Sequence, residues 1–207
     1  MNEGRLVYLM GPSGAGKDSV LQGLQQSLAG RRLRIARRII TRSAEAVGED
    51  AVGVSPQAFD DLESAGAFAM AWRANGLAYG IPREIDSWLL GGYQVVVNGS
   101  RGYLDEARRR YPTLLPILLE VEPAILRARL NARARESGDQ IEARLARSAA
   151  FTDNHALRGD PSIVRVDNSA SLETTVKRLL EIVKSHSASG ASVSYTHLRA
   201  HETKANL

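Results

Sequence analysis

The residues best suited to chemistry lie near the amino terminus, in the stretch Gly11-Pro-Ser-Gly-Ala-Gly-Lys17. Two glycines five positions apart, the second followed directly by a lysine, are typical of a phosphate-binding loop, or P-loop. Small residues let successive backbone N–H groups turn inward around a phosphate, and the lysine adds positive charge at the outer oxygens. The motif predicts a nucleotide site made of Gly11, Pro12, Ser13, Gly14, Ala15, Gly16, Lys17, Asp18 and Ser19.

The position after the lysine departs from the usual loop. A hydroxyl there normally binds Mg²⁺, but this chain has Asp18, and the nearest hydroxyl is Ser19. Either side chain could help to hold the ion, and Asp18 could instead stabilise the start of a helix through its charge. The sequence therefore predicts Mg²⁺ as a cofactor and leaves its protein ligand open.

The elements around this loop have the pattern that the motif needs. The apolar run Leu6–Met10 predicts a buried strand before the loop, and Val20, Leu21 and Leu24 recur at helical spacing after it. Further strands are predicted at 33–40, 93–98, 114–121 and 163–166, and helices at 104–111, from Pro123, and at 172–184. Such alternation predicts an α/β fold, a parallel sheet with helices on both faces. Pro116 is expected to push its part of the strand toward a sheet edge or a bulge.

Composition limits the classes of protein that remain. Of the 207 residues, 27 Lys and Arg against 23 Asp and Glu give a net charge of +4, which does not favour a nucleic-acid-coating protein. The absence of cysteine excludes disulfide frameworks, zinc–thiolate sites and thiol nucleophiles. No apolar run approaches the roughly 18 to 20 residues that span a bilayer. We expect a cytoplasmic protein without a membrane or nucleic-acid partner.

An arginine-rich segment narrows the choice among P-loop proteins. Residues 127–147 carry six arginines around a Ser137-Gly-Asp139 break. The segment resembles the lid of nucleoside-monophosphate kinases, in which arginines close over the transferring phosphoryl group. The chain also lacks the Asn-Lys-x-Asp guanine signature of switch GTPases and is too short for most motor ATPases. A small-molecule kinase is the predicted class, with a lid at about 131–145.

Several motifs together resemble the guanylate kinase family. They are the P-loop, Ile40-Thr41-Arg42, Gly76-Leu-Ala-Tyr79-Gly80, and Arg133 and Arg144 in the lid segment. The resemblance covers roughly residues 4 to 185 and implies a P-loop kinase fold, with Lys17, Arg133 and Arg144 acting on the transferring phosphoryl group.

The departures from that family concern the acceptor. The second phosphate-binding arginine of the family is Glu45 here, its guanine-reading glutamate is Met70, its strand-end aspartate is Asn98, and its phosphate-binding tyrosine has no counterpart near Ser55. A methionine cannot accept hydrogen bonds from the N1 and N2 donors of guanine, and loss of such a partner typically costs a few kcal/mol. GMP is therefore not the expected acceptor.

A narrower family fits better. The stretches Gly11–Ser19, Arg38-x-Ile-Thr-Arg42, Trp72–Gly80, Glu84-Ile-Asp86-x-Trp88 and Val97-Asn-Gly-Ser-Arg101 resemble the ribose 1,5-bisphosphate phosphokinases of phosphonate breakdown. The resemblance implies ATP as donor and ribose 1,5-bisphosphate as the small-molecule acceptor. An acceptor with two phosphates and no base suits a pocket of arginines and hydroxyls, which predicts as ligands Arg38, Thr41, Arg42, Tyr79, Asn98, Ser100 and Arg101.

The expected organisation is one kinase domain over residues 1–186, with an acceptor-binding insertion at about 38–90. Residues 187–207 are expected to be disordered, and their last part resembles a string read from foreign DNA. Two alternatives remain open at this point: a guanylate-type or other sugar-phosphate kinase, and a non-catalytic guanylate-kinase-like binding module.

Overall fold

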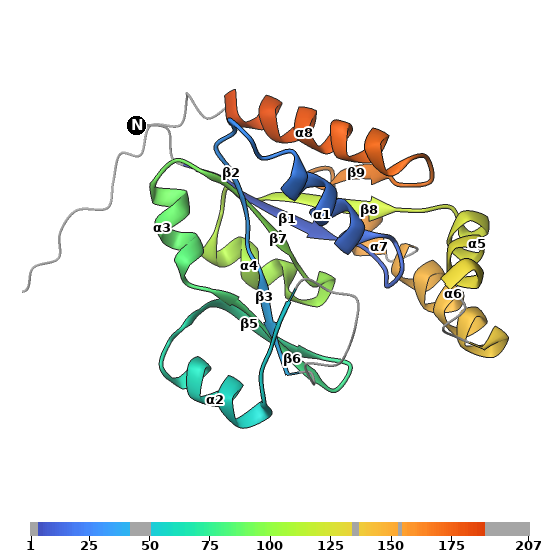
Figure 1. The fold of residues 1–207 in the computed structure, drawn as a ribbon, viewed down its shortest axis with the longest axis horizontal. Helices are drawn as coiled ribbons and strands as arrows, with labels where there is room; N and C mark the ends of the chain where they lie inside the picture. Colours follow the sequence, from blue (N-terminus) through green and yellow to red (C-terminus); the bar gives the residue numbers. More distant parts are fainter. Residues whose placement is uncertain (1–3, 42–50, 134–136, 153–154, 189–207) are drawn as a thin grey trace, which may run out of the picture.

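The computed structural model describes residues 4–41, 51–133, 137–152 and 155–188, and its chain builds two sheets (Figure 1). The larger sheet has five strands in the order β2-β7-β1-β8-β9, and the smaller has four in the order β4-β3-β6-β5. The lid helices extend from the carboxyl side of β8, away from the smaller sheet.

All pairs in the larger sheet are parallel. The central strand is β1, and each of its five residues is buried because helices cover both faces of the sheet. The strands are β1 (Leu6–Met10), β2 (Leu33–Ile35), β7 (Gln94–Asn98), β8 (Leu115–Glu120) and β9 (Val164–Asp167).

Two separate apolar layers cover this sheet. Helices α1 (Lys17–Gln26) and α8 (Leu172–Ala188) pack on one face, where Gly23 lets them approach closely: a Cβ there would lie 2.7 Å from Val176 Cγ2. Helices α3 (Glu84–Leu90) and α4 (Leu104–Arg110), the latter preceded by the 3-10 turn η1 (Arg101–Tyr103), pack on the other face. The sheet is therefore a rigid platform whose carboxyl edge carries the loops.

The smaller sheet holds β3 (Arg38–Ile40), β4 (Ala51–Gly53), β5 (Phe68–Ala74) and β6 (Leu77–Pro82). Strands β5 and β6 form a hairpin whose turn residues Asn75 and Gly76 both have positive φ, as a tight two-residue turn requires. Helix α2 (Pro56–Ser64) is capped by Ser55, whose Oγ accepts a hydrogen bond from Ala58 N. The ring of Phe59 in this helix stacks on the ring of Phe68 in β5.

The predicted lid, at about 131–145, lies within a helical hairpin of α5 (Pro123–Arg133) and α6 (Gly138–Thr152), which is followed by the short α7 (His155–Arg158). Leu126, Leu130 and Ile141 form a small apolar cluster between α5 and α6. The hairpin thus has a core of its own beside the main sheet.

The predicted alternation, the parallel sheet and the buried first strand are confirmed. The prediction of one strand over 33–40 is wrong, because the chain leaves the larger sheet after Ala36, whose N bonds Val96 O, and starts β3 in the smaller sheet at Arg38. Strand β8 is internal, but its pairing with β9 begins only at Ile117, so Pro116 has a single neighbouring strand, β1. Helix α8 runs four residues beyond its predicted end at 184. The first two residues of the segment predicted to be disordered, 187–207, are therefore helical, and the rest of that segment lies outside the described residues.

Within the described part of the chain, no helix combines the length and the apolar character needed to cross a membrane.

Candidate active site

The glycine-rich loop joins β1 to α1 in the way that the motif predicts. Gly14 has φ of 91°, and Gly16, the N-cap of α1, has φ of 89°. Residues other than glycine rarely adopt this left-handed backbone conformation. A Cβ at Gly11 would lie 2.7 Å from the main-chain oxygen of Leu119, so the loop also touches the neighbouring strand β8. These positions need glycine for conformation and for space.

Two basic side chains lie along this loop. Lys17 Nζ donates to the carbonyl oxygens of Gly11 at 2.8 Å and Pro12 at 3.0 Å, which folds the side chain back over the loop. Arg144, from α6 in the lid, donates from Nη1 to Ser13 Oγ at 2.8 Å. The structure thus brings together Lys17 and one of the two predicted lid arginines.

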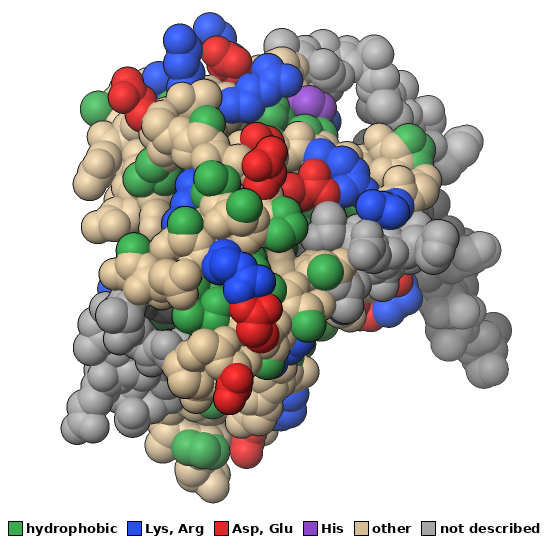
Figure 2. Space-filling model, turned by 90° about the vertical axis from the view of Figure 1, so that its right-hand side faces the viewer, with side chains coloured by type: hydrophobic (Ala, Val, Ile, Leu, Met, Phe, Trp, Pro, Cys, Tyr) green, Lys and Arg blue, Asp and Glu red, His purple; other side chains and the backbone are tan. Residues whose placement is uncertain are grey.

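The other predicted lid arginine, Arg133, is the last residue of α5, and its side chain lies outside the described residues. Other arginines of the segment have structural contacts: Arg127 is paired with Glu142 across the hairpin, and Arg129 donates to Ala170 O at 3.3 Å. Figure 2 shows the side of the molecule on which the lid lies, with acidic and basic side chains intermingled. Not every arginine of this segment is therefore placed to meet phosphate.

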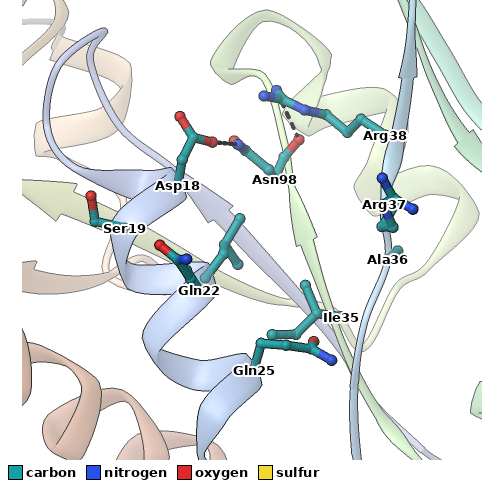
Figure 3. A pocket seen from close by; sticks show the side chains of 10 residues that line it. Asp18, Ser19, Gln22, Gln25, Ile35, Ala36, Arg37, Arg38 and Asn98 are labelled. Atoms are coloured by element: carbon teal, nitrogen blue, oxygen red, sulfur yellow. Dashed lines mark hydrogen bonds between the residues drawn. The ribbon is translucent and has the colours of Figure 1, made fainter. Parts of the chain in front are cut away.

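A cavity of about 380 Å³ opens between α1 and the start of β3. Asp18 and Ser19 line it from α1, and Arg38 and Asn98 line it from the opposite side (Figure 3). The Asp18 side chain points toward Asn98, whereas Ser19 points away from it. The remaining lining residues are Leu21, Gln22, Gln25, Ile35, Ala36 and Arg37.

Asn98 connects the two sides of this cavity. Its Nδ2 donates to Asp18 Oδ1 at 3.1 Å, and its main-chain oxygen accepts from Arg38 Nη1 at 3.5 Å. Only 3% of Asn98 is exposed, because β7 ends between its neighbours β1 and β2. The P-loop helix and the first strand of the smaller sheet are thereby joined through one amide residue.

The turn after Asn98 is held by hydrogen bonds to Tyr8 of the neighbouring strand β1. The Tyr8 hydroxyl donates to Ser100 O at 2.8 Å and accepts from Ser100 N at 2.9 Å. Burial raises the pKa of Tyr8 well above its ordinary value, so the hydroxyl keeps its proton. Gly99 is needed because a Cβ there would lie 2.2 Å from the Tyr8 ring.

Tyr79 and Thr41 belong to the smaller sheet. The Tyr79 ring stacks on Trp72 with centroids 5.5 Å apart, and the Arg38 guanidinium lies 5.5 Å from the Tyr79 centroid. Thr41 Oγ1 accepts from Ala78 N at 2.8 Å, which ties the end of β3 to β6. Tyr79 therefore contacts Arg38, and neither Tyr79 nor Thr41 is among the residues that line the cavity.

The other predicted ligands have different positions. Arg101 opens η1 beside Ser100, half-buried at the carboxyl end of β7, and Arg42 lies outside the described residues. Met70 is 1% exposed within the apolar core cluster that contains Ile81 and Ile85. A side chain buried in this way does not offer hydrogen bonds to a base.

Sequence reasoning missed two residues that hold the site. Tyr8 reads as one more apolar residue of a buried strand. Asn168, which follows β9, donates from Nδ2 to Ala15 O at 2.7 Å within the loop. No local motif marks either side chain, because their partners are 92 and 153 residues away.

Comparison with known proteins agrees with this geometry. The chain is 63% identical over 177 residues to ribose 1,5-bisphosphate phosphokinase PhnN of Pseudomonas paraeruginosa, covering 86% of this chain and 94% of that protein. It is 56% identical over 181 residues to the protein of the same name in Azotobacter vinelandii, covering 87% and 96%. The chain belongs to the ribose 1,5-bisphosphate phosphokinase family. No protein-family model matches it.

A solved structure supports the fold of this phosphokinase family member. Guanylate kinase from Anaplasma phagocytophilum superposes with a TM-score of 0.68 at 19% identity, over 90% of this chain and 87% of that one. The predicted P-loop kinase fold is therefore confirmed, and the likeness carries no information about the acceptor.

Proposed function

We propose that this phosphokinase transfers the γ-phosphoryl group of ATP to the 1-phosphate of ribose 1,5-bisphosphate, giving 5-phospho-α-D-ribose 1-diphosphate and ADP. The relatives at 63% and 56% identity bear the name of this activity. The observation that carries the proposal is the cavity beside the P-loop, where Arg38, Asn98 and Asp18 provide charged and amide groups. Met70, at the position expected to read guanine, is withdrawn into the core.

The proposed reaction requires no covalent bond between the protein and its substrates. An oxygen of the acceptor 1-phosphate bonds to the γ-phosphorus of ATP, and the bond from that phosphorus to the β,γ-bridging oxygen breaks, leaving its electron pair on ADP. The acceptor phosphate is already anionic at neutral pH, so no general base is required. The chain has to position two anions, offset their charge and exclude water.

On the donor side, backbone amides of Ser13 to Asp18 hold the β-phosphate and Lys17 contacts the β- and γ-phosphates. The left-handed glycines of the loop support this assignment. Arg144 is assigned to the transferring group because its bond to Ser13 already places it at the loop. Arg133 is assigned the same part on its motif alone.

On the acceptor side, Arg38 is the proposed phosphate ligand with the firmest support, since it lines the cavity and is held by Asn98 and Tyr79. Asn98 and Ser100 are the proposed ligands of the sugar hydroxyls. Thr41, Arg42, Tyr79 and Arg101 complete the proposed acceptor site.

The start of α1 offers suitable oxygen ligands for Mg²⁺. Asp18 supplies a carboxylate and Ser19 a hydroxyl, both lining the cavity, and such hard oxygen donors fit this ion. A kinase Mg²⁺ is generally held by one or two protein oxygens together with substrate phosphates. When bound, the ion would neutralise charge on the transferring group.

We also propose that residues 1–186 act as a single kinase domain, with the segment at about 38–90 as its acceptor-binding part and 131–145 as its lid. ATP and a sugar bisphosphate are intracellular metabolites, which favours the cytoplasm as the site of action. Neither a nucleic acid nor a membrane is expected as a partner.

A phosphorus NMR assay tests the proposed function. The protein is incubated with ATP, Mg²⁺ and ribose 1,5-bisphosphate, and a new diphosphate signal should grow together with that of ADP. A parallel reaction with GMP should give no GDP. Turnover of GMP without consumption of ribose 1,5-bisphosphate would overturn the assignment in favour of a guanylate-type kinase.

A further inference from the structure

The P-loop rests on a buried amide that the motif does not contain. Asn168 follows β9 and is 3% exposed. Its Nδ2 donates to Ala15 O at 2.7 Å, and its own main-chain N donates to Glu120 O at 2.8 Å. The main chain of Asn168 is thus bonded to strand β8, and its side chain is bonded to the loop.

The orientation of the Asn168 amide is fixed at both ends. The Ala15 carbonyl can only accept a hydrogen bond, so the amide nitrogen must face it. Thr175, in the first turn of α8 and 1% exposed, donates from Oγ1 to Asn168 Oδ1 at 2.8 Å. Both polar ends of this buried side chain therefore have partners, and turning the amide over would set Oδ1 against the Ala15 carbonyl oxygen and lose that bond.

This contact sets the plane of one loop peptide. In a trans peptide the C=O and the following N–H point in opposite directions. Holding the Ala15 oxygen toward Asn168 therefore directs the Gly16 N–H to the opposite side. The same contact explains why residue 16 is glycine, since a Cβ there would lie 2.6 Å from Asn168 Nδ2.

We infer that Asn168 is a positioning residue for the nucleotide: it orients the Ala15–Gly16 peptide of the donor loop, and Thr175 keeps Asn168 in the orientation that does so. The inference deepens the proposed function, since it rests on the loop being the ATP site. It predicts that disturbing Asn168 weakens nucleotide binding and leaves acceptor binding unchanged.

The substitution Asn168→Asp tests this directly, because it keeps the shape and replaces the donor with an acceptor. Burial favours the protonated carboxyl, which could still donate to Ala15 O, so the assays are run at about pH 9 to favour ionisation. The ionised carboxylate would face the Ala15 carbonyl, which is 2.7 Å from the wild-type amide nitrogen, and the peptide would have to turn. Affinity for ADP, measured by calorimetry, should fall about ten- to hundredfold, and KM for ATP should rise by a similar factor. KM for ribose 1,5-bisphosphate should stay within about twofold of the wild type.

Asn75→Asp is the matched control. It makes the same atom change at an exposed hairpin turn of the smaller sheet and should leave both KM values unchanged. Thr175→Val serves as a second variant that retains Asn168, and should weaken ADP binding less than Asn168→Asp, with Thr175→Ser restoring it. Circular dichroism and melting temperature identify any variant that has not folded.

Three outcomes would overturn the inference, and a fourth would reject the proposed function. Folded Asn168→Asp protein that binds ADP as well as Asn75→Asp would overturn the inference, and so would an equal rise in both KM values. If Asn168→Asp does not fold, unchanged ADP binding by Thr175→Val would overturn it as well. Failure of the wild type to phosphorylate ribose 1,5-bisphosphate would instead reject the proposed function, while the ADP measurement would still decide the role of Asn168.

Discussion

The proposed donor loop and the proposed acceptor cavity are built in different ways. The donor loop comes from consecutive residues between β1 and α1, and its shape is held by backbone conformation and by one buried hydrogen bond from Asn168. The proposed acceptor wall is formed by Asn98 of β7 and Arg38 of β3, which line the cavity from two different sheets, and Tyr79 of β6 contacts Arg38. The proposed donor site is thus a local motif, and the proposed acceptor site is a product of tertiary packing.

The difference explains how one fold can serve acceptors of different chemistry. A loop that binds phosphate through its backbone does not depend on what receives the phosphate. Side chains on a small separate sheet can change while the donor loop remains. Met70, on β5 of the smaller sheet at the position expected to read guanine, is such a change.

The largest expected effect comes from the donor loop. Lys17→Ala removes the charge that we assign to the β- and γ-phosphates and should lower kcat/KM for ATP about a thousandfold. Steady-state kinetics with both substrates measures it. The exposed Lys177 of α8 provides the control Lys177→Ala, which should keep wild-type rates. Activity above a tenth of wild type in Lys17→Ala would contradict the assignment of the loop as the catalytic donor site.

A smaller and more selective effect is expected at the acceptor wall. Arg38→Lys keeps the charge but loses the planar fork that reaches Asn98 O and lies over Tyr79. KM for ribose 1,5-bisphosphate should rise about tenfold, the cost typical of a hydrogen bond to a charged group, with KM for ATP unchanged.

Arg31→Lys is the matched control. Arg31 is exposed and its Nε donates to Ser27 O, and its replacement should change neither the KM for ATP nor the KM for ribose 1,5-bisphosphate. An increase in KM for ATP as large as that for the acceptor in Arg38→Lys would remove the proposed separation of the two sites.

A site made of consecutive residues can be predicted from sequence more readily than one assembled from distant residues. Gly11 to Lys17 lie in one stretch, so their spacing alone predicted the loop. The break between β2 and β3 was missed because residues 33–40 read as one alternating run, and only the packing of Ala36 against β7 shows where the chain changes sheets. Tyr8 and Asn168 were missed because a residue that supports a distant loop has no local signature. Tertiary partners, and not propensities, determine the acceptor side.

The smallest expected effect is at Tyr8, which lies in β1 before the loop and whose hydroxyl holds the turn after Asn98. Tyr8→Phe removes the hydroxyl that holds both polar groups of Ser100 and leaves buried backbone atoms without that partner. The free energy of unfolding should fall by about 1–3 kcal/mol, measured by urea denaturation. Tyr93→Phe makes the same atom change on a ring that lies 4.4 Å from the Arg34 guanidinium, and should cost less.

The stability of Tyr8→Phe should also respond differently to alkaline pH. Burial raises the pKa of Tyr8 in the folded protein, whereas the unfolded chain ionises near pH 10. Above about pH 10 the unfolded state therefore releases a proton that the folded state retains, and wild-type stability falls as the pH rises. Tyr103 and Tyr111 also have raised pKa values and contribute to this fall. Removing Tyr8 should make the fall shallower, and an unchanged slope would mean that the hydroxyl between the two regions is not buried in solution.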